Sequence, residues 1–500
     1  MLTSESNRLW EDITRATDKV GGPLALSLRF PLFIALQPGD HLTPGRQLRE
    51  MAASFRDFIR SVKKVLPPVP KGKPLFCFAH ATPSNMKNLL PVAREARRRG
   101  LLGGIVTAEN YSNELREFSG ISPIVSASDL TPPLTTSERV ALLSEMVSIY
   151  TRVRRAMLEY RPEFGYLMLR TIGSLTRHLA CAARFGEPLG RLLDSWQPSC
   201  VVCTSDFWPF ESQLCYQASC RSIPFVVSQH GTIGHHWWPF VADVYCMWGD
   251  AFVEQMQSLG ASRDRLASIG MPASDDLFNK IGSIDKVAPR LERPVCLILS
   301  HTHGRYLEPE IFDAFRKVLP EVINKTPEIT WKVKLHPVED RSFYQQMGAD
   351  VYNRLTFYSQ GASLEGAVRE CDIATTLYST AGLEAMMLDR PLAVACPSSR
   401  VEELAWWPAQ GGGVYVRTAQ EYITTLTRLA LDSKHRDAQL TAQRTFLARA
   451  FANQGHAAES LVSFIEKYFT GPREAGCPGS DLHAAGEANS GDATLLPILR

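Results

Sequence analysis

Short apolar runs that alternate with helix-like stretches restrict the fold of this chain more than any other feature of its sequence. Strands are predicted at 74–79, 104–107, 200–204, 224–228 and 267–270, and again at 295–300, 329–335, 372–377 and 392–395. Amphipathic stretches such as 86–99, 210–221 and 309–322 lie between them. Strands separated by helices at these spacings predict parallel sheets with helices on both faces. A chain of 500 residues is too long for one core, so we expect two such domains.

The expected domain boundaries follow changes in composition. Residues 1–70 are mostly helical in pattern and end in a proline-rich stretch, so we interpret them as an N-terminal extension. The first α/β domain is expected at 71–285, and a polar linker leads into the second domain at 286–470. From 471 to 500 the chain is rich in glycine, alanine, serine and acidic residues without periodicity, which predicts a disordered tail.

Composition and charge argue against nucleic acid as a partner and against a membrane span. The formal net charge is only +2, whereas a nucleic-acid-binding domain carries a basic stripe. The first 21 residues lack the apolar core of a signal peptide. No run reaches the about 20 apolar residues that a membrane-spanning helix needs. Apolar residues make up 45% of the chain and charged residues 21%, which is typical of a soluble enzyme, and we expect a cytoplasmic one.

The cysteines do not predict a metal site. Many of the 11 cysteines lie in apolar runs, as reduced cysteines of cytosolic proteins do. Cys200 and Cys203 have the spacing of a zinc-ligand pair, but the following Cys215 and Cys220 do not. The first pair also lies in a predicted strand. We therefore expect no metal.

Two motifs of the second domain follow predicted strands directly. The strand 329–335 contains Lys334 and ends at His336 and Pro337, and proline halts a strand, which would place the imidazole at the carboxyl end of the sheet. Ser379 and Thr380 follow the strand 372–377 and open a helix, where hydroxyl caps and unpaired backbone N–H groups favour an anion. Glu384 in the first turn of that helix is positioned to bind a ribose hydroxyl. A turn histidine and a well-capped helix without a ligand are the structural alternatives.

A third motif, after the first strand of the second domain, contains His303, Gly304 and Arg305. A glycine-containing loop with a guanidinium suits a diphosphate or an acidic sugar, because arginine binds such groups with two hydrogen bonds. The spacing of His301 and His303 also fits a metal pair, but no carboxylate-rich partner accompanies them. We therefore favour phosphate contact over metal, and a solvated loop is the structural alternative.

The first domain supplies the candidates for a general base. Asp206 follows one predicted strand, and His230 follows the next strand along the chain. Either side chain would face the second domain and could take a proton from an acceptor hydroxyl. Glu211 is a third candidate, although it falls within a predicted helix. The run His235-His-Trp-Trp238 is a possible acceptor wall, but aromatic pairs more often simply pack.

Together these motifs resemble those of bacterial GT-B enzymes that build capsules and other surface carbohydrates. That group includes sialyltransferases, Kdo transferases and CDP-glycerol-type polymerases that share an HP motif. The matching runs are Lys334-Leu-His-Pro337, Ser379-Thr380 with Leu383-Glu384-Ala385, Gln229-His-Gly231, and Ile269-Gly-Met-Pro272 with Asp275 nearby. The resemblance covers residues 73–470 as spaced short motifs. It implies that His336, Ser379 and Thr380 hold the donor phosphate. The acidic motif that supplies the base in sialyltransferases has no clear match.

The resemblance implies a GT-B fold, in which two Rossmann-like parallel-sheet domains face a central cleft. It also implies a metal-independent glycosyltransferase that takes a sugar from a nucleotide-activated donor, a CMP-linked one among the candidates. The implied acceptor is a surface polysaccharide or a lipid-linked glycan, and no cofactor is needed besides the nucleotide-sugar substrate. A lipid-linked acceptor implies peripheral contact with the inner face of the membrane, to which Arg94 and Arg97 to Arg99 would contribute.

Three alternatives share the architecture. A sugar-nucleotide 2-epimerase needs acids and histidines that converge on the sugar, and it needs no acceptor. A CDP-alditol phosphotransferase moves a phospho-alditol instead of a sugar. A non-catalytic scaffold of polysaccharide assembly would neither bind nucleotide nor turn over a donor. The fold alone does not decide among them.

Overall fold

The computed structural model describes Asp12, Ile13 and Arg15 and most of the chain from Lys71 to Thr470. In that stretch the described residues are 71–78, 83–108, 115–120, 122–130, 135–160, 172–233, 237, 240–281, 293–301, 309–336, 339–359 and 361–470. The helical extension expected at 1–70, apart from those three residues, and the tail expected at 471–500 lie outside the described residues.

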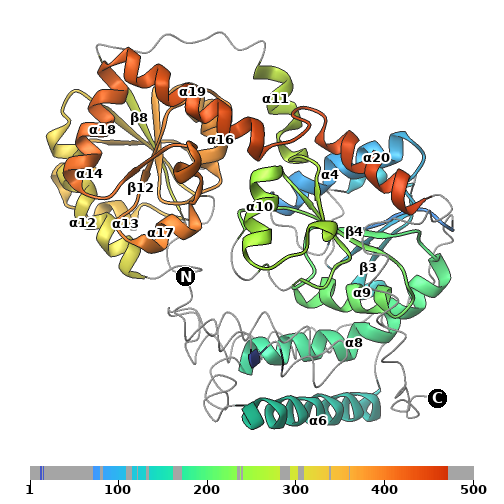
Figure 1. Cartoon of the computed structure of the whole chain (residues 1–500). Helices are drawn as coiled ribbons and strands as arrows, with labels where there is room; N and C mark the ends of the chain where they lie inside the picture. Colours follow the sequence, from blue (N-terminus) through green and yellow to red (C-terminus); the bar gives the residue numbers. More distant parts are fainter. Residues whose placement is uncertain are drawn as a thin grey trace.

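The first domain is built on a parallel sheet in which the described residues form seven strands, in the order β3-β2-β1-β4-β5-β6-β7 (Figure 1). These strands are β1 (Leu75–Phe78), β2 (Gly104–Thr107), β3 (Ile124–Ser126), β4 (Val201–Cys203), β5 (Phe225–Ser228), β6 (Val244–Met247) and β7 (Leu266–Ser268). Its helices are α4 (Pro83–Arg98), α5 (Ala127–Leu130), α6 (Thr136–Tyr160), α8 (Ile172–Trp196), α9 (Pro209–Ser219) and α10 (Asp250–Ser258), with 3₁₀ turns at Arg116–Phe118, Arg263–Arg265 and Pro272–Ser274.

Helix α11 (Asp275–Ile281) leads toward the second domain, whose described residues form a six-stranded parallel sheet in the order β10-β9-β8-β11-β12-β13. Its strands are β8 (Val295–Leu299), β9 (Thr330–Lys334), β10 (Leu355–Phe357), β11 (Ile373–Thr376), β12 (Leu392–Ala395) and β13 (Val414–Val416). Its helices are α12 (Pro309–Lys325), α13 (Ser342–Gln345), α14 (Ala349–Tyr352), α15 (Leu364–Arg369), α16 (Ala381–Met387), α17 (Ser399–Leu404), α18 (Ala419–Leu431) and α19 (Ser433–Ala450), with a 3₁₀ turn at Trp407–Gln410.

The structure has a strand at each of the predicted ranges. Every residue of β1, β4, β8, β11 and β12 is buried, which is why all of these strands except β11, with its two threonines, are continuous apolar runs. Sequence analysis missed β3, β6, β10 and β13. Three of these are three-residue strands at the edges of the sheets, too short to show a periodic pattern. The fourth strand, β6, follows a tryptophan-rich segment. Because that segment is also apolar, no change in the sequence pattern marks where β6 begins.

A capping box precedes α6. The Thr135 backbone N–H donates to Oε2 of Glu138 at 2.7 Å, and the Glu138 backbone N–H donates to Oγ1 of Thr135 at 3.3 Å. This reciprocal pair is the sequence signature of a helix start. Helices α6 and α8 have 25 residues each, yet no described helix has an apolar stretch long enough to cross a membrane.

The last helix, α20 (Ala457–Phe469), corrects the domain boundary expected at 470. It belongs spatially to the first domain, where it lies beside α4 (Figure 1). Its buried residues Leu461, Val462 and Ile465 share a core with Leu89 and Val92 of α4. The chain therefore crosses between the domains twice, because the apolar face of α20 is buried against the first sheet's helix layer and not against the second.

Candidate functional site

A cavity of about 1420 Å³ opens between the two domains at the carboxyl ends of their strands. In each sheet the strand order reverses beside a central strand, between β1 and β4 in the first and between β8 and β11 in the second. Open α/β sheets bind ligands outside the carboxyl ends of their strands at such a point. Ser300 follows β8 and Ser379 follows β11, and both line the cavity. The cavity is therefore where this fold is expected to hold a ligand.

Lys334 and His336 line the cavity where β9 ends, as predicted. The turn is fixed on both sides. The Ser300 backbone N–H donates to the Lys334 carbonyl at 3.1 Å, and the Glu339 backbone N–H donates to the His336 carbonyl at 2.9 Å. Burial lowers the pKa of His336, the Glu339 carboxylate raises it, and the Lys334 ammonium lowers it further. A phosphate placed here would favour the protonated imidazole, so ligand charge and histidine charge are coupled.

The Ser379–Thr380 turn also lines the cavity, but its geometry differs from the predicted helix cap. Oγ of Ser379 accepts from the Ala381 backbone N–H at 3.3 Å, and the Ser379 N–H donates to Oγ1 of Thr376 at 3.3 Å. Thr380 has helical dihedral angles and its side chain makes no cap hydrogen bond. Because α16 has only seven residues, its dipole is short. An anion placed here would therefore depend on hydroxyl groups and nearby cations more than on the helix dipole.

His230 reaches the cavity from the first domain because Gln229 fixes the loop after β5. The fully buried Gln229 accepts through Oε1 from the Trp248 backbone N–H at 2.8 Å. Its carbonyl accepts from Nε1 of Trp248 at 2.9 Å. The imidazole of His230 then stacks on the ring of Trp237, with 4.8 Å between the ring centroids. Glutamine is thus the anchor of the Gln229-His-Gly231 motif, and histidine is the residue of the motif that lines the cavity.

The hydrogen bond of His230 determines its tautomer. Nδ1 lies 2.5 Å from the carbonyl oxygen of Thr204, and because a carbonyl can only accept, Nδ1 carries the proton. Nε2 is then the nitrogen with the lone pair. Burial lowers the pKa of His230 to about 4, with the Thr204 contact acting in the opposite direction. At neutral pH the imidazole is therefore in its basic form.

Asp206, the other predicted base, does not line the cavity. It is 2% exposed and its Oδ2 accepts from the backbone N–H groups of Val241 and Ala242 at 2.6 and 2.9 Å, while its Oδ1 accepts from the Tyr245 hydroxyl at 2.5 Å. Burial raises the pKa of Asp206 and these hydrogen bonds lower it. In this structure the carboxylate holds the loop before β6 in place.

Glu211, the third candidate, also lies outside the cavity lining and is 1% exposed. Burial raises the pKa of this carboxyl to about 8, and the nearby Asp206 raises it as well. The native state therefore keeps a proton that the unfolded chain releases near its ordinary pKa of 4.5. Between those two values the unfolded state binds fewer protons, so this group makes the native state less stable as the pH rises.

We expect Glu211→Gln to be more stable than the wild type at pH 8, by roughly 3 kcal/mol. The difference should shrink toward pH 5, where both side chains are neutral in the native state. Urea unfolding at pH 5, 6.5 and 8 measures it, with the exposed Glu254→Gln as the matched control. Equal pH dependence in the wild type and Glu211→Gln would contradict the raised pKa.

Several predicted residues lie outside the described part of the chain. These are His303, Gly304, Arg305 and Pro337, together with His235, His236 and Trp238 of the possible acceptor wall. His301 and His336, the described residues that directly precede two of these segments, lie near each other. His301 packs on Tyr378, with 3.8 Å between the ring centroids, and its ring is nearly parallel to that of His336. His301, the last described residue after β8, therefore lies near His336.

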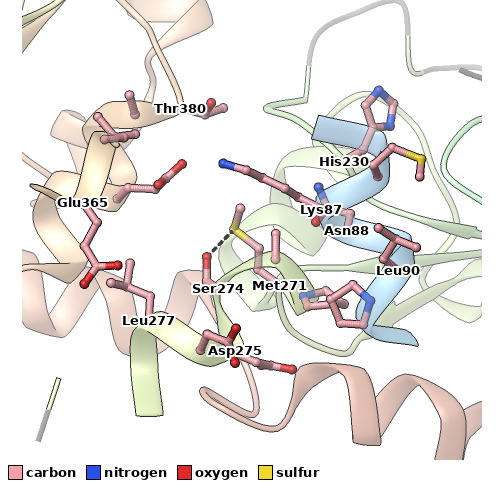
Figure 2. Close-up of a pocket in the computed structure, with 18 of the residues that line it drawn as sticks. Lys87, Asn88, Leu90, His230, Met271, Ser274, Asp275, Leu277, Glu365 and Thr380 are labelled. Atoms are coloured by element: carbon pink, nitrogen blue, oxygen red, sulfur yellow. Dashed lines mark hydrogen bonds between the residues drawn. The ribbon is translucent and has the colours of Figure 1, made fainter. Parts of the chain in front are cut away.

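Lys87 is a cavity residue that sequence analysis missed. Its side chain extends from α4 across the opening toward Thr380 of the second domain (Figure 2). Burial raises the pKa of the predicted residue Glu384, which also lines the cavity, and the Lys87 ammonium lowers it. Lys87 therefore lies close to the opposite wall. The available signal was its position shortly after β1, because phosphate-binding residues often follow the first strand of a doubly wound sheet.

The arginines of α4 are engaged within the protein. Arg94 binds Glu117 at 2.7 Å, Arg97 donates to the Glu117 carbonyl at 2.7 Å, and Arg98 binds Glu95 at 2.7 Å. The two ion pairs offset the charges of Arg94 and Arg98, whereas the carbonyl contact leaves the charge of Arg97 unchanged. Among the described residues, no group of three or more histidine, cysteine, aspartate or glutamate side chains is arranged to hold a metal ion.

Two parallel α/β domains with a ligand-sized cavity between their carboxyl edges define the GT-B fold, as predicted. A putative UDP-N-acetylglucosamine 2-epimerase from Listeria monocytogenes is similar with a TM-score of 0.51 and 12% identity, over 80% of this chain and 97% of that one. The UDP-GlcNAc 2-epimerase from Neisseria meningitidis bound to UDP-GlcNAc gives 0.49 and 14%, over 79% and 100%. The calicheamicin glycosyltransferase CalG4 gives 0.45 and 14%, over 79% and 98%. No protein-family model and no curated protein sequence matches the chain.

Proposed function

We propose that this protein is a glycosyltransferase that moves a sugar from a nucleotide-activated donor to a glycan acceptor, either a surface polysaccharide or a lipid-linked glycan. One observation carries the proposal. The cavity has phosphate-compatible groups on its second-domain wall, Lys334, His336 and the Ser379–Thr380 hydroxyls, and a histidine in its basic form, His230, on the other wall. A group-transfer reaction needs both: a place for the leaving nucleotide and a base for the incoming hydroxyl.

In the proposed reaction the donor phosphate lies against Lys334, His336 and the hydroxyl groups of the Ser379–Thr380 turn. The acceptor hydroxyl oxygen forms a bond to the anomeric carbon, and its proton moves to Nε2 of His230. The bond between the anomeric carbon and the phosphate oxygen breaks, and its electron pair stays on the phosphate. The cations of the cavity stabilise that charge more strongly than the charge of the bound donor.

A nucleotide-sugar 2-epimerase is the second candidate. The Listeria protein with the 0.51 TM-score is described as one, and the cavity also holds the carboxylates of Glu365 and Glu384 besides His230. Elimination and readdition of a nucleotide require groups that move a proton at the sugar, and these residue types can do so. The difference from a transferase is the acceptor, since an epimerase converts its nucleotide sugar without one.

The proposal is tested by a thermal-shift panel with CMP, CDP, UDP, GDP and their sugar conjugates. A nucleotide at about 100 times its Kd should add about 2.7 kcal/mol of stability, and His336→Ala should abolish most of that gain. His435→Ala, outside the cavity on α19, is the matched control. Incubation of the selected nucleotide sugar alone then separates the candidates, because only an epimerase changes its sugar. A cooperative melt unaffected by every nucleotide would leave the non-catalytic scaffold.

A further inference from the structure

One described lysine of the cavity, Lys87, is held by no hydrogen bond or ion pair within the protein, although its charge acts on Glu384 of the second domain. Six lysine and arginine side chains are among its described lining residues: Lys87, Arg94, Arg97, Arg98, Lys280 and Lys334. The three arginines are held by Glu117 and Glu95, Lys280 has a partner in the protein, and Lys334 donates to the Leu335 carbonyl. Among these six described side chains, the exposed Lys87 is the one that forms no hydrogen bond or ion pair. Its ammonium is therefore available to a ligand.

The position of Lys87 indicates which part of a ligand it meets. Figure 2 shows its side chain crossing from α4 toward Thr380, and its charge affects Glu384 on α16. Lys334 and His336 line the same cavity from the second domain. A ligand between these walls therefore meets one ammonium group from the second domain, that of Lys334, and another from the first domain, that of Lys87. Two separated cations complement two negative groups better than one.

We propose that the donor is a nucleoside diphosphate sugar and that Lys87 binds its distal phosphate. This inference rests on the proposed function. In a nucleoside monophosphate sugar the single phosphate is attached to the ribose, so Lys334 and His336 suffice to hold it. A diphosphate places a second phosphate one step nearer the sugar and the first domain, where His230 meets the acceptor. Lys87 neutralises that phosphate and, because it comes from the other domain, ties donor binding to closure of the cavity.

The test measures dissociation constants by calorimetry for the matched pairs UMP and UDP, CMP and CDP, and GMP and GDP. In the wild type we expect the diphosphate of one base to bind about tenfold more tightly than its monophosphate. Lys87→Ala should remove that preference by weakening the diphosphate alone. Lys87→Arg should keep most of it, and Lys317→Ala, an exposed lysine of α12, should change nothing. Because the Lys87 side chain is exposed and makes no hydrogen bond, we expect the variants to unfold at the wild-type temperature.

Three results would overturn the inference while leaving the proposed function intact. The wild type would bind a monophosphate such as CMP as tightly as its diphosphate, or Lys87→Ala would weaken both members of a pair equally. A Lys87 effect confined to nucleotide sugars with a carboxylate on the sugar would also overturn it, since the ammonium would then bind the sugar. Absence of binding by all six nucleotides would overturn the proposed function as well.

Discussion

His230→Ala should lower the rate of sugar transfer by about 10²–10⁴-fold, the usual contribution of a positioned general base. The affinity for the nucleotide should stay unchanged, because His230 is not one of the side chains proposed to bind phosphate. The measurement is release of nucleotide from the donor identified by the binding panel, with a lipid-linked glycan as acceptor. Since the pKa of His230 is lowered to about 4 by burial, protonation of this imidazole should reduce the rate only as the pH falls toward that value.

His230→Asn is the matched control for the fold of the loop. An asparagine amide can donate to the Thr204 carbonyl as Nδ1 of the histidine does, but it lacks the basic Nε2. We therefore expect the asparagine variant to melt like the wild type and to be as inactive as the alanine variant. Activity near the wild-type level in His230→Asn would show that Nε2 takes no proton. Loss of nucleotide binding in either variant would place His230 in the donor site instead.

Gly270→Ala should destabilise the protein by about 3 kcal/mol or more. Gly270 has a φ of +117°, and a Cβ there would lie 2.4 Å from the Ala452 carbonyl oxygen and 2.6 Å from Cβ of Ala457. Neither neighbour can easily move. The Ala452 backbone N–H donates to the Trp248 carbonyl, and the Ala457 N–H donates to Asp275, both at 2.8 Å. Urea unfolding followed by tryptophan fluorescence measures the loss.

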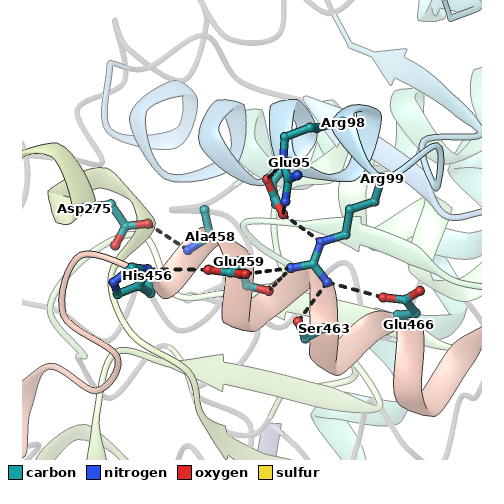
Figure 3. A network of polar contacts seen from close by, with 9 residues as sticks. All are labelled: Glu95, Arg98, Arg99, Asp275, His456, Ala458, Glu459, Ser463 and Glu466. Atoms are coloured by element: carbon teal, nitrogen blue, oxygen red, sulfur yellow. Dashed lines mark hydrogen bonds and ion pairs between the residues drawn. The ribbon is translucent and has the colours of Figure 1, made fainter.

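The large effect is expected because Gly270 lies where the chain returns to the first domain. Figure 3 shows this crossing and the helix that follows it. Asp275 accepts from the Ala458 N–H at 2.8 Å, and the side chain of Arg99, the residue directly after α4, binds Glu459 and Glu466 of α20. A side chain at Gly270 would push this segment away from the first domain and weaken the contacts that hold α20.

Two other glycines separate backbone strain from steric overlap. Gly348 has a φ of +98°, and a Cβ there would have no other atom within 4 Å, so Gly348→Ala should cost only about 1 kcal/mol of strain. Gly249 has extended dihedral angles, but a Cβ would lie 2.4 Å from the backbone of Ala450. Gly249→Ala therefore measures overlap without strain. If Gly270→Ala were no worse than Gly348→Ala, the close contact at the crossing would not be limiting.

Much of the fold was predictable because its information is local. Buried strands in a doubly wound sheet are continuous apolar runs, and the strands predicted at 104–107 and 392–395 have the bounds of β2 and β12. The candidate donor residues His336 and Ser379 were found for the same reason. Each directly follows a recognisable strand, and the carboxyl ends of parallel strands meet at one edge of the sheet.

The choice between Asp206 and His230 was not local. Both residues follow strands of the first sheet, so the sequence pattern treats them alike. Whether a carboxylate or an imidazole faces the cavity depends on partners far along the chain, Tyr245 for Asp206 and Trp248 for the Gln229 that positions His230. Such pairings leave no periodic signal, since they join loops whose approach is set by the order of the strands.

The sequence by itself determined two parallel α/β domains and the edge of each sheet at which chemistry is placed, because apolar periodicity and strand-ending residues act over a few neighbouring positions. Only the tertiary structure decided which side chains share the cavity. It turned Asp206 inward as a loop anchor, brought Lys87 of the first domain to Glu384 of the second, and returned α20 to the first domain. These outcomes depend on contacts between residues far apart along the chain, whose geometry exists only once both sheets have formed.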